Sequence, residues 1–297
     1  MLTKGMSPIE DQFSATHIAH DELIASHVKP YIGDADWQVL TGNLGRIAED
    51  PQPALLARVF TGISRIVKPA DKGRWISLDG AAGPGRNQLP LLVKDWTPAR
   101  LLRVWTLMHI PPLEQAAYVQ LIERLFLYGE MEELVALYSA LPVFYYPEAW
   151  RHRCTEGIRS NIGPVREAIM ADNPYAAAYL DEGAWNQLVL KGFFTEADMQ
   201  RIVGLEKRNN ARLASALVDY AHELHAAKRT ISPHLWLLVA PFMDERAYSL
   251  MRNILEEHPD TGTSRAIAVA FHRSDYAPAK ALLRENSELT DLLNTAG

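Results

Sequence analysis

The 297-residue sequence is almost free of cysteine, and Cys154 is the single one. A disulfide within the molecule and a metal centre of several thiolates are therefore excluded. Long apolar runs are also missing, and without a stretch of about 18 apolar residues no transmembrane helix is predicted. Residues 1–23 carry acidic side chains and no continuous apolar segment, which does not fit a secretory signal. We expect a cytoplasmic protein without an integral membrane segment.

Positive charge is scarce too, because 30 lysines and arginines face 36 acidic residues and the net charge is −6. Nucleic-acid binding needs a basic surface, so no nucleic-acid partner is expected. Complete catalytic motifs are missing as well. The glycines at 80, 83 and 85 fit neither a dinucleotide fingerprint nor a P-loop, and His222-Glu223-Leu224-His225 is one residue short of the zinc motif HExxH. We expect neither a metal nor a cofactor, and enzyme activity stays undecided.

The residues that are present indicate helices. Hydrophobic residues make up 48% of the chain and recur at helical spacing. Thr97 before Pro98 is typical of a helix start, with a capping hydroxyl and a proline in the first turn. Similar starts occur at Pro147, Pro164, Pro174, Ser232 and Asp244. The pattern predicts an all-α fold, an array of antiparallel helix pairs in a HEAT-like α-α superhelix or solenoid.

One segment interrupts this pattern. Residues 79–90, DGAAGPGRNQLP, are rich in glycine, proline and polar side chains, which is typical of a linker. We therefore expect a weaker N-terminal helical region at 1–78, a linker at 79–90 and a main helical array at 91–297.

Arginines cluster in the helix expected from residue 147 to about 160. Trp150, Cys154 and Ile158 form its apolar stripe, and Arg159 and Asn161 follow near its end. Guanidinium groups bind phosphate and carboxylate, and the helix start near residue 164 also favours anions. Alternatively, nearby glutamates pair with these arginines on a solvated face.

Two further helices place polar groups in unusual positions. The segment 181–194 is so apolar that we expect it to be buried nearly all round, yet it contains Asn186 and Lys191 beside Trp185. A buried amide must be hydrogen-bonded, so Asn186 either locks two helices together or lines a pocket. The helix from about 209 to 228 carries Asp219 on the side away from its apolar stripe, as part of a solvated face or of an acidic cluster.

Four motifs fall within residues 142–225: EGIRSN at 156–161 with a proline shortly after, NPY at 173–175, WNQLVLK at 185–191, and IVGL to DYA at 202–221. Together they resemble the EboA family, whereas residues 1–70 add nothing to the resemblance. EboA-like proteins are encoded beside a UbiA-type prenyltransferase and hydrolase-like proteins. The resemblance therefore implies a role in making or moving a secondary metabolite, and it supplies no catalytic motif.

We expect a helical binding or scaffold protein that holds a small-molecule intermediate or another protein of the same metabolite pathway. The alternative is an enzyme of that pathway, acting on a prenylated or anionic intermediate in a pocket near residues 159, 186 and 219. A third hypothesis is an interaction solenoid without a ligand, using aromatics such as Trp37, Trp75 and Trp96. The candidate ligand-binding residues are Arg159, Asn161, Asn173, Tyr175, Trp185, Asn186, Lys191 and Asp219.

Overall fold

The structure is a computed structural model that describes residues 21–78, 89–257 and 259–294. Backbone contacts divide it into two compact units. The first unit runs to Asp181 and includes Arg201–Val203; the second comprises Glu182–Gln200 and the chain from Gly204 onward. Most of the expected linker, residues 79–88, lies outside the described residues, so the boundaries at 78 and 91 stay predictions.

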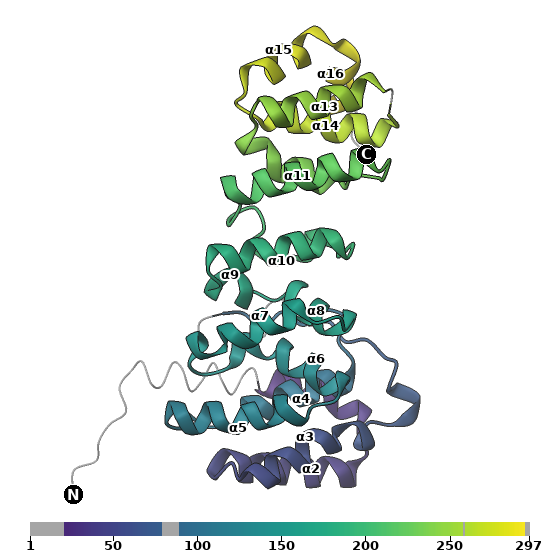
Figure 1. Cartoon of the computed structure of the whole chain (residues 1–297). Coiled ribbons are helices and arrows are strands. Elements are labelled where there is room, and N and C mark those ends of the chain that lie inside the picture. Colours follow the sequence, from purple (N-terminus) through teal and green to yellow (C-terminus); the bar gives the residue numbers. More distant parts are fainter. Residues whose placement is uncertain (1–20, 79–88, 258, 295–297) are drawn as a thin grey trace, which may run out of the picture. The chain divides into compact units, whose positions relative to one another are not determined.

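The first unit is built from helices (Figure 1). Residues 21–28 are helical, and α2 and α3 pack together, as do α3 and α4, α4 and α6, and α7 and α8. The helices are α2 (Asp34–Glu49), α3 (Pro53–Ile66), α4 (Pro98–Met108), α5 (Gln115–Tyr128), α6 (Met131–Ser139), α7 (Arg151–Arg159), α8 (Gly163–Met170) and α9 (Tyr175–Tyr179).

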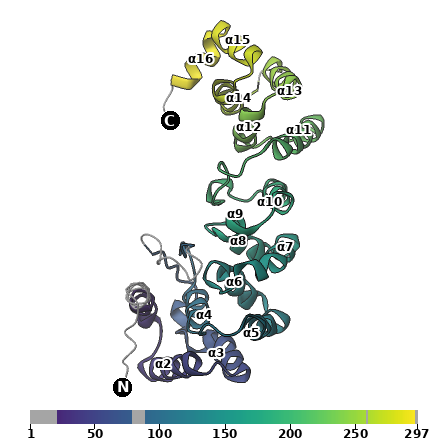
Figure 2. The ribbon, with the colours of Figure 1, turned by 90° about the vertical axis from the view of Figure 1, so that its left-hand side faces the viewer.

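The second unit is also helical, and α14 packs there against α12, α15 and α16 (Figure 2). Its helices are α10 (Glu182–Phe194), α11 (Ala211–Ala226), α12 (Pro233–Val239), α13 (Glu245–Glu256), α14 (Thr261–Arg273), α15 (Ala277–Glu285) and α16 (Ser287–Asn294). In the described part of the chain, extended pairing is limited to isolated bridges, which agrees with the predicted all-α class. Among the described helices, none combines the length and the hydropathy that a membrane span requires.

The predicted helix starts are largely confirmed. The Thr97 hydroxyl accepts a hydrogen bond from the Arg100 backbone N–H at 3.2 Å, and the Asp244 carboxylate caps α13 in the same way. These caps satisfy donors that have no partner inside their helix. The expected continuous helix from Pro147 to Ser160 is wrong in one respect. Residues 147–150 form a 3-10 turn, because the Trp150 backbone (φ −99°, ψ 0°) departs from α-helical values before α7 begins.

Close packing of α7 depends on Gly157, the glycine of the EGIRSN motif. A Cβ atom at this position would lie 2.6 Å from Cε1 of Tyr138 and in contact with the Ile169 side chain. Because such a contact is too short for any side chain, only glycine lets α7 approach α6 and α8 this closely. The motif therefore has a packing role.

Candidate functional site

Helix α4 is buried on nearly every side, because it packs against α3 on one side and α6 on another. Arg103 stands in the middle of this helix and is only 2% exposed. Burying an unpaired charge is costly, so a buried guanidinium needs acceptors within reach. The surroundings of Arg103 are therefore a candidate functional site.

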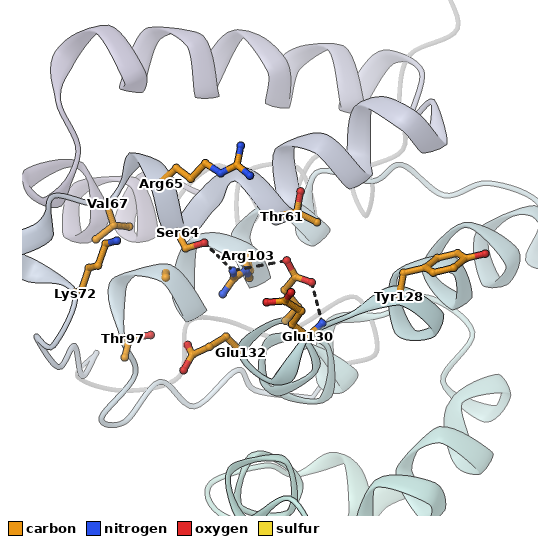
Figure 3. Close-up of a pocket in the computed structure, with 12 residues that line it drawn as sticks. Thr61, Ser64, Arg65, Val67, Lys72, Thr97, Arg103, Tyr128, Glu130 and Glu132 are labelled. Carbon is orange, nitrogen blue, oxygen red and sulfur yellow. Dashed lines mark hydrogen bonds and ion pairs between the residues drawn. The ribbon is translucent and has the colours of Figure 1, made fainter.

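The guanidinium of Arg103 is incompletely paired (Figure 3). Its Nε donates to the Phe60 carbonyl at 3.3 Å and its Nη2 to the Ser64 hydroxyl at 3.4 Å, both long distances. The Glu133 carboxylate lies 3.9 Å from Nη2. The third nitrogen, Nη1, is buried and has no hydrogen-bond acceptor among the described residues.

The Glu133 carboxylate is shared between Arg103 and the N-terminal cap of α6. Its Oε2 accepts the Glu130 backbone N–H at 3.1 Å, while the Glu130 side chain accepts the Glu133 backbone N–H in a reciprocal capping box. Burial lowers the pKa of the Arg103 guanidinium, and the carboxylates of Glu133, Glu132 and Glu130 offset only part of that effect. The positive charge of Arg103 is thus undercompensated.

Arg100, one turn earlier on α4, shows the contrast. Its Nε donates to the Ser139 hydroxyl at 2.8 Å and its guanidinium stacks 4.3 Å above the Trp96 ring. Burial lowers the pKa of Arg100 to about 10, although its side chain is only partly buried in the helix packing. Arg103 lies over a more distant ring, that of Phe60 at 5.8 Å, and differs from Arg100 in its long hydrogen bonds and in an Nη1 that has no acceptor among the described residues.

That donor belongs to a residue that lines a cavity of about 560 Å³, which we call the Arg103 cavity. Pockets of this size bind small molecules. In Figure 3, Lys72 and Tyr128 lie at opposite sides of the cavity and Arg103 lies between them. The charged residues of its lining are Arg65, Lys72, Arg103, Glu130, Glu132 and Glu133.

The chemistry available in the Arg103 cavity is binding by hydrogen bonds and charge. A guanidinium donates to carboxylate or phosphate oxygens in a fixed planar geometry. Nη1 of Arg103 is a donor that has no acceptor among the described residues. Across the described ranges, no three His, Cys, Asp or Glu side chains are grouped so that they could hold a metal ion.

The predicted candidates in the first unit lie elsewhere. Arg159 and Asn161 are exposed at the end of α7. Asn173 is buried and donates to the carbonyls of Tyr138 and Ala168 at 3.1 and 2.9 Å. The structure brings Asn173 and Tyr175 together, because the Tyr175 backbone N–H donates to the Asn173 side chain at 3.0 Å. These bonds give the NPY motif a structural role.

In the second unit, Asn186 and Asn210 exchange hydrogen bonds of 3.2 and 2.9 Å, which join α10 to the start of α11. Trp185 is buried beneath the Arg208 guanidinium. Lys191 is half-buried, and Asp219 forms an exposed ion pair with Arg246.

The expectation that α10 is buried nearly all round is wrong. Gln187 is exposed and Phe194 is 54% exposed, since α10 has α11 on one face and leaves another face open.

Two of the three arginines of α7, Arg151 and Arg153, pair with glutamates, as one of the two interpretations of the sequence proposed. Arg151 pairs with Glu148, and Arg153 pairs with Glu156 and with Glu123 of α5. Their charges are therefore satisfied within the first unit. Of the eight residues predicted to bind a ligand, none lines the Arg103 cavity, and a ligand-binding role for them stays a prediction.

The second unit has a cavity of about 700 Å³ beside α10 and α11. Lys228 and Arg229 line it, and both are exposed, so water already solvates their charges. Phe194 and Tyr220 meet edge to face at 4.6 Å in the same lining. The Arg103 cavity is the stronger candidate, because its charge is buried.

A family model described as "Metabolite traffic protein EboA" matches residues 21–240. The chain belongs to the EboA family. The EboA match contains every residue that lines the Arg103 cavity. It also begins at residue 21, so the expectation that residues 1–70 add nothing to the resemblance is wrong for residues 21–70. No curated protein and no solved structure gives a significant match to the chain.

Arg103 is not among the residues predicted from the sequence, although the sequence contains a signal for it. Arg103 interrupts the run LLRVWTLM, on the side of the helix away from the stripe of Leu101, Leu102 and Trp105. On a helix with one buried face, that side is solvated. Helix α4 instead buries the Arg103 side too, since every residue from 101 to 107 is buried.

Proposed function

We propose that this EboA-family protein is a non-catalytic binding protein of a metabolite pathway, and that it holds a small acidic metabolite in the Arg103 cavity. The observation that carries the proposal is the buried Nη1 of Arg103, which has no acceptor among the described residues and belongs to a residue of the cavity wall. The family description, metabolite traffic, agrees with a protein that carries its ligand unchanged.

The charge of the ligand follows from the surroundings of Arg103. A neutral carbonyl could accept from Nη1, but it would leave the buried charge as poorly compensated as before. The nearest carboxylate, Glu133, is 3.9 Å away and occupied by the α6 cap. An incoming carboxylate or phosphate satisfies the donor and the charge together, and such charge-assisted bonds are about twice as strong as neutral ones.

Thermal unfolding tests the proposal with acetate, benzoate and inorganic phosphate as probes. A ligand that binds the folded chain raises the unfolding temperature. We expect at least one probe to do so, and we expect Arg103→Met to weaken its binding roughly 10- to 100-fold, because one charged hydrogen-bond donor is lost. Arg212→Met is the control, since Arg212 has an 85% exposed side chain in the second unit. Equal stabilisation of Arg103→Met and wild type would overturn the proposal.

Further features of the pathway role are part of this proposal. We propose that the helices form HEAT-like antiparallel pairs, which is supported by the pairwise packing of neighbouring helices within each unit. We also propose a cytoplasmic location and contacts with other proteins of the same pathway, in support of biosynthesis or export of a secondary metabolite. Co-purification from a native host tests the contacts, and an experimental structure tests the helix pairing.

The alternative of an enzyme acting near residues 159, 186 and 219 has weaker support. Asn186 is hydrogen-bonded to Asn210, and Asp219 is paired with Arg246 at an exposed position. A general base needs a free lone pair within hydrogen-bond reach of its substrate. Turnover of a pathway intermediate that is lost in Asp219→Asn and retained in Arg103→Met would favour the enzyme.

A further inference from the structure

The first unit contains a further cavity, of about 330 Å³, between α3 and α5. Most of its wall is apolar, and we call it the apolar chamber. The apolar residues come from two helices: Pro53, Ala54, Ala57 and Phe60 from α3, and Leu121 and Leu125 from α5. The side chains of these six residues offer no hydrogen bonds to a polar group, and they favour hydrocarbon or aromatic atoms over water.

The apolar chamber adjoins the Arg103 cavity. Thr61, Tyr128 and Glu133 line both spaces. Tyr128 is 79% exposed, and Figure 3 shows it on the side of the Arg103 cavity opposite Lys72. A molecule bound to Arg103 can therefore extend past Thr61 and Tyr128 into the apolar chamber without crossing the protein core.

We propose that the two spaces hold one ligand, an acidic amphiphile whose anionic group binds Arg103 and whose hydrocarbon or aromatic part fills the apolar chamber. The inference rests on the proposed function and adds the class of ligand. Its two parts match the two walls: a free buried donor on one side, and aliphatic and aromatic carbon on the other. Phe60 belongs to both environments, because its carbonyl accepts from Arg103 while its side chain lines the apolar chamber.

A second cation, Arg124, lies at the edge of the apolar chamber and is exposed. It offers a competing position for the acidic group, in which the ligand would leave the Arg103 cavity empty. Arg103 is favoured because its charge is buried and incompletely paired, whereas water solvates Arg124. Comparison of Arg103→Met with Arg124→Met distinguishes the two positions.

The experiment is a calorimetric titration of the full chain with straight-chain carboxylates from butanoate to decanoate, below the concentrations at which they form micelles. Each methylene that enters an apolar space strengthens binding about fourfold. We expect affinity to rise by about this factor per methylene until the apolar chamber is full. Arg103→Met should weaken every acid by a similar factor and keep the dependence on chain length, whereas Arg124→Met should have little effect.

The second part of the experiment uses variants in which a larger side chain fills the apolar chamber. Ala57→Phe places a ring where the chain would lie, and it should abolish the dependence on chain length while butanoate still binds. Ala54→Phe, on the same wall, serves if Ala57→Phe fails to fold. Ala48→Phe is the matched control, because Ala48 is exposed on α2, outside both linings, and should keep the dependence.

The outcomes separate the two proposals. If no carboxylate and no phosphate binds, the proposed function fails. If short and long acids bind equally and need Arg103, acid binding holds and the amphiphile is rejected. An unchanged dependence on chain length in folded Ala57→Phe and Ala54→Phe also rejects it, because the chain would then lie outside the apolar chamber.

Discussion

Nη2 of Arg103 lies 3.9 Å from Oε1 of Glu133, beyond hydrogen-bond distance, while the other oxygen of Glu133 accepts the backbone N–H of Glu130. The α6 cap thus holds the carboxylate back from the guanidinium. Closer approach of the two charges would cost α6 one of its capping bonds. The arrangement leaves Nη1 of Arg103 buried without an acceptor among the described residues, and it gives Arg103 and Glu133 different roles in stability.

Substitutions at these two positions should change stability in opposite directions. Replacement of a whole buried ion pair by apolar side chains is often neutral or stabilising by about 1–4 kcal/mol, whereas loss of one partner of a tight buried pair is costly. Because the Arg103–Glu133 contact is long and Glu133 keeps its hydrogen bond from the Glu130 backbone N–H, Arg103→Met should leave the free energy of unfolding unchanged or raise it. Glu133→Gln removes the nearest compensating charge and should lower it by about 1–3 kcal/mol. Urea unfolding of both variants measures the difference. A large loss of stability in Arg103→Met would show that the guanidinium is a structural tie.

The amide pair of Asn186 and Asn210 should be a structural lock. Asn210 also caps α11 by accepting the Leu213 backbone N–H at 2.9 Å, so Asn210→Ala loses a cap and should cost about 1–2 kcal/mol. Asn186→Ala should cost about 1 kcal/mol, and the double variant should show coupling of about 0.5 kcal/mol or more. Gln187→Ala, at the exposed neighbour, is the control. Full additivity of the two asparagine substitutions in urea unfolding would contradict the lock.

Glycine substitutions should have opposite effects at two helical positions. Gly157→Ala forces a methyl group against Tyr138 and Ile169 and should destabilise the chain by about 1–3 kcal/mol. Gly45→Ala on α2 meets nothing within 4 Å and should stabilise by up to about 1 kcal/mol, because alanine favours the helix. Thermal unfolding of the two variants checks the signs. A neutral Gly157→Ala would mean that α7 has room to move.

Low pH should weaken the ion pair of Glu123 and Arg153, which joins α5 to α7. Burial raises the pKa of Glu123, but hydrogen bonds and charge from Arg153, aided by His152, outweigh it and hold that pKa below its ordinary value of 4.5. A depressed carboxyl pKa means that the ion pair stabilises the fold above pH 4.5 and that this contribution is lost as the pH falls through the lower, folded-state pKa. Unfolding temperatures measured downward from pH 6 should fall more steeply in wild type than in Glu123→Gln. Parallel curves would show that the pair adds nothing.

Much of the fold could be predicted because its signals are local. Thr97 and Asp244 cap the helices that follow them, and such caps depend on neighbours within a turn. Arg103 could not be recognised in this way. Its burial depends on α3 and α6, which are distant in sequence, and its missing acceptor depends on how Glu133 caps α6. Asn186 was noticed for its apolar surroundings, but its partner Asn210 is 24 residues away.

The most direct test of acid binding at Arg103 is the side-chain Nε–H resonance of that residue in the ¹⁵N-labelled chain, assigned by its absence from Arg103→Met. Benzoate is the probe. The account predicts that this resonance shifts on titration and saturates with a single dissociation constant, because the acid changes the charge and hydrogen bonds of the guanidinium. A resonance that stays in place at saturating benzoate, in a folded protein, would contradict it.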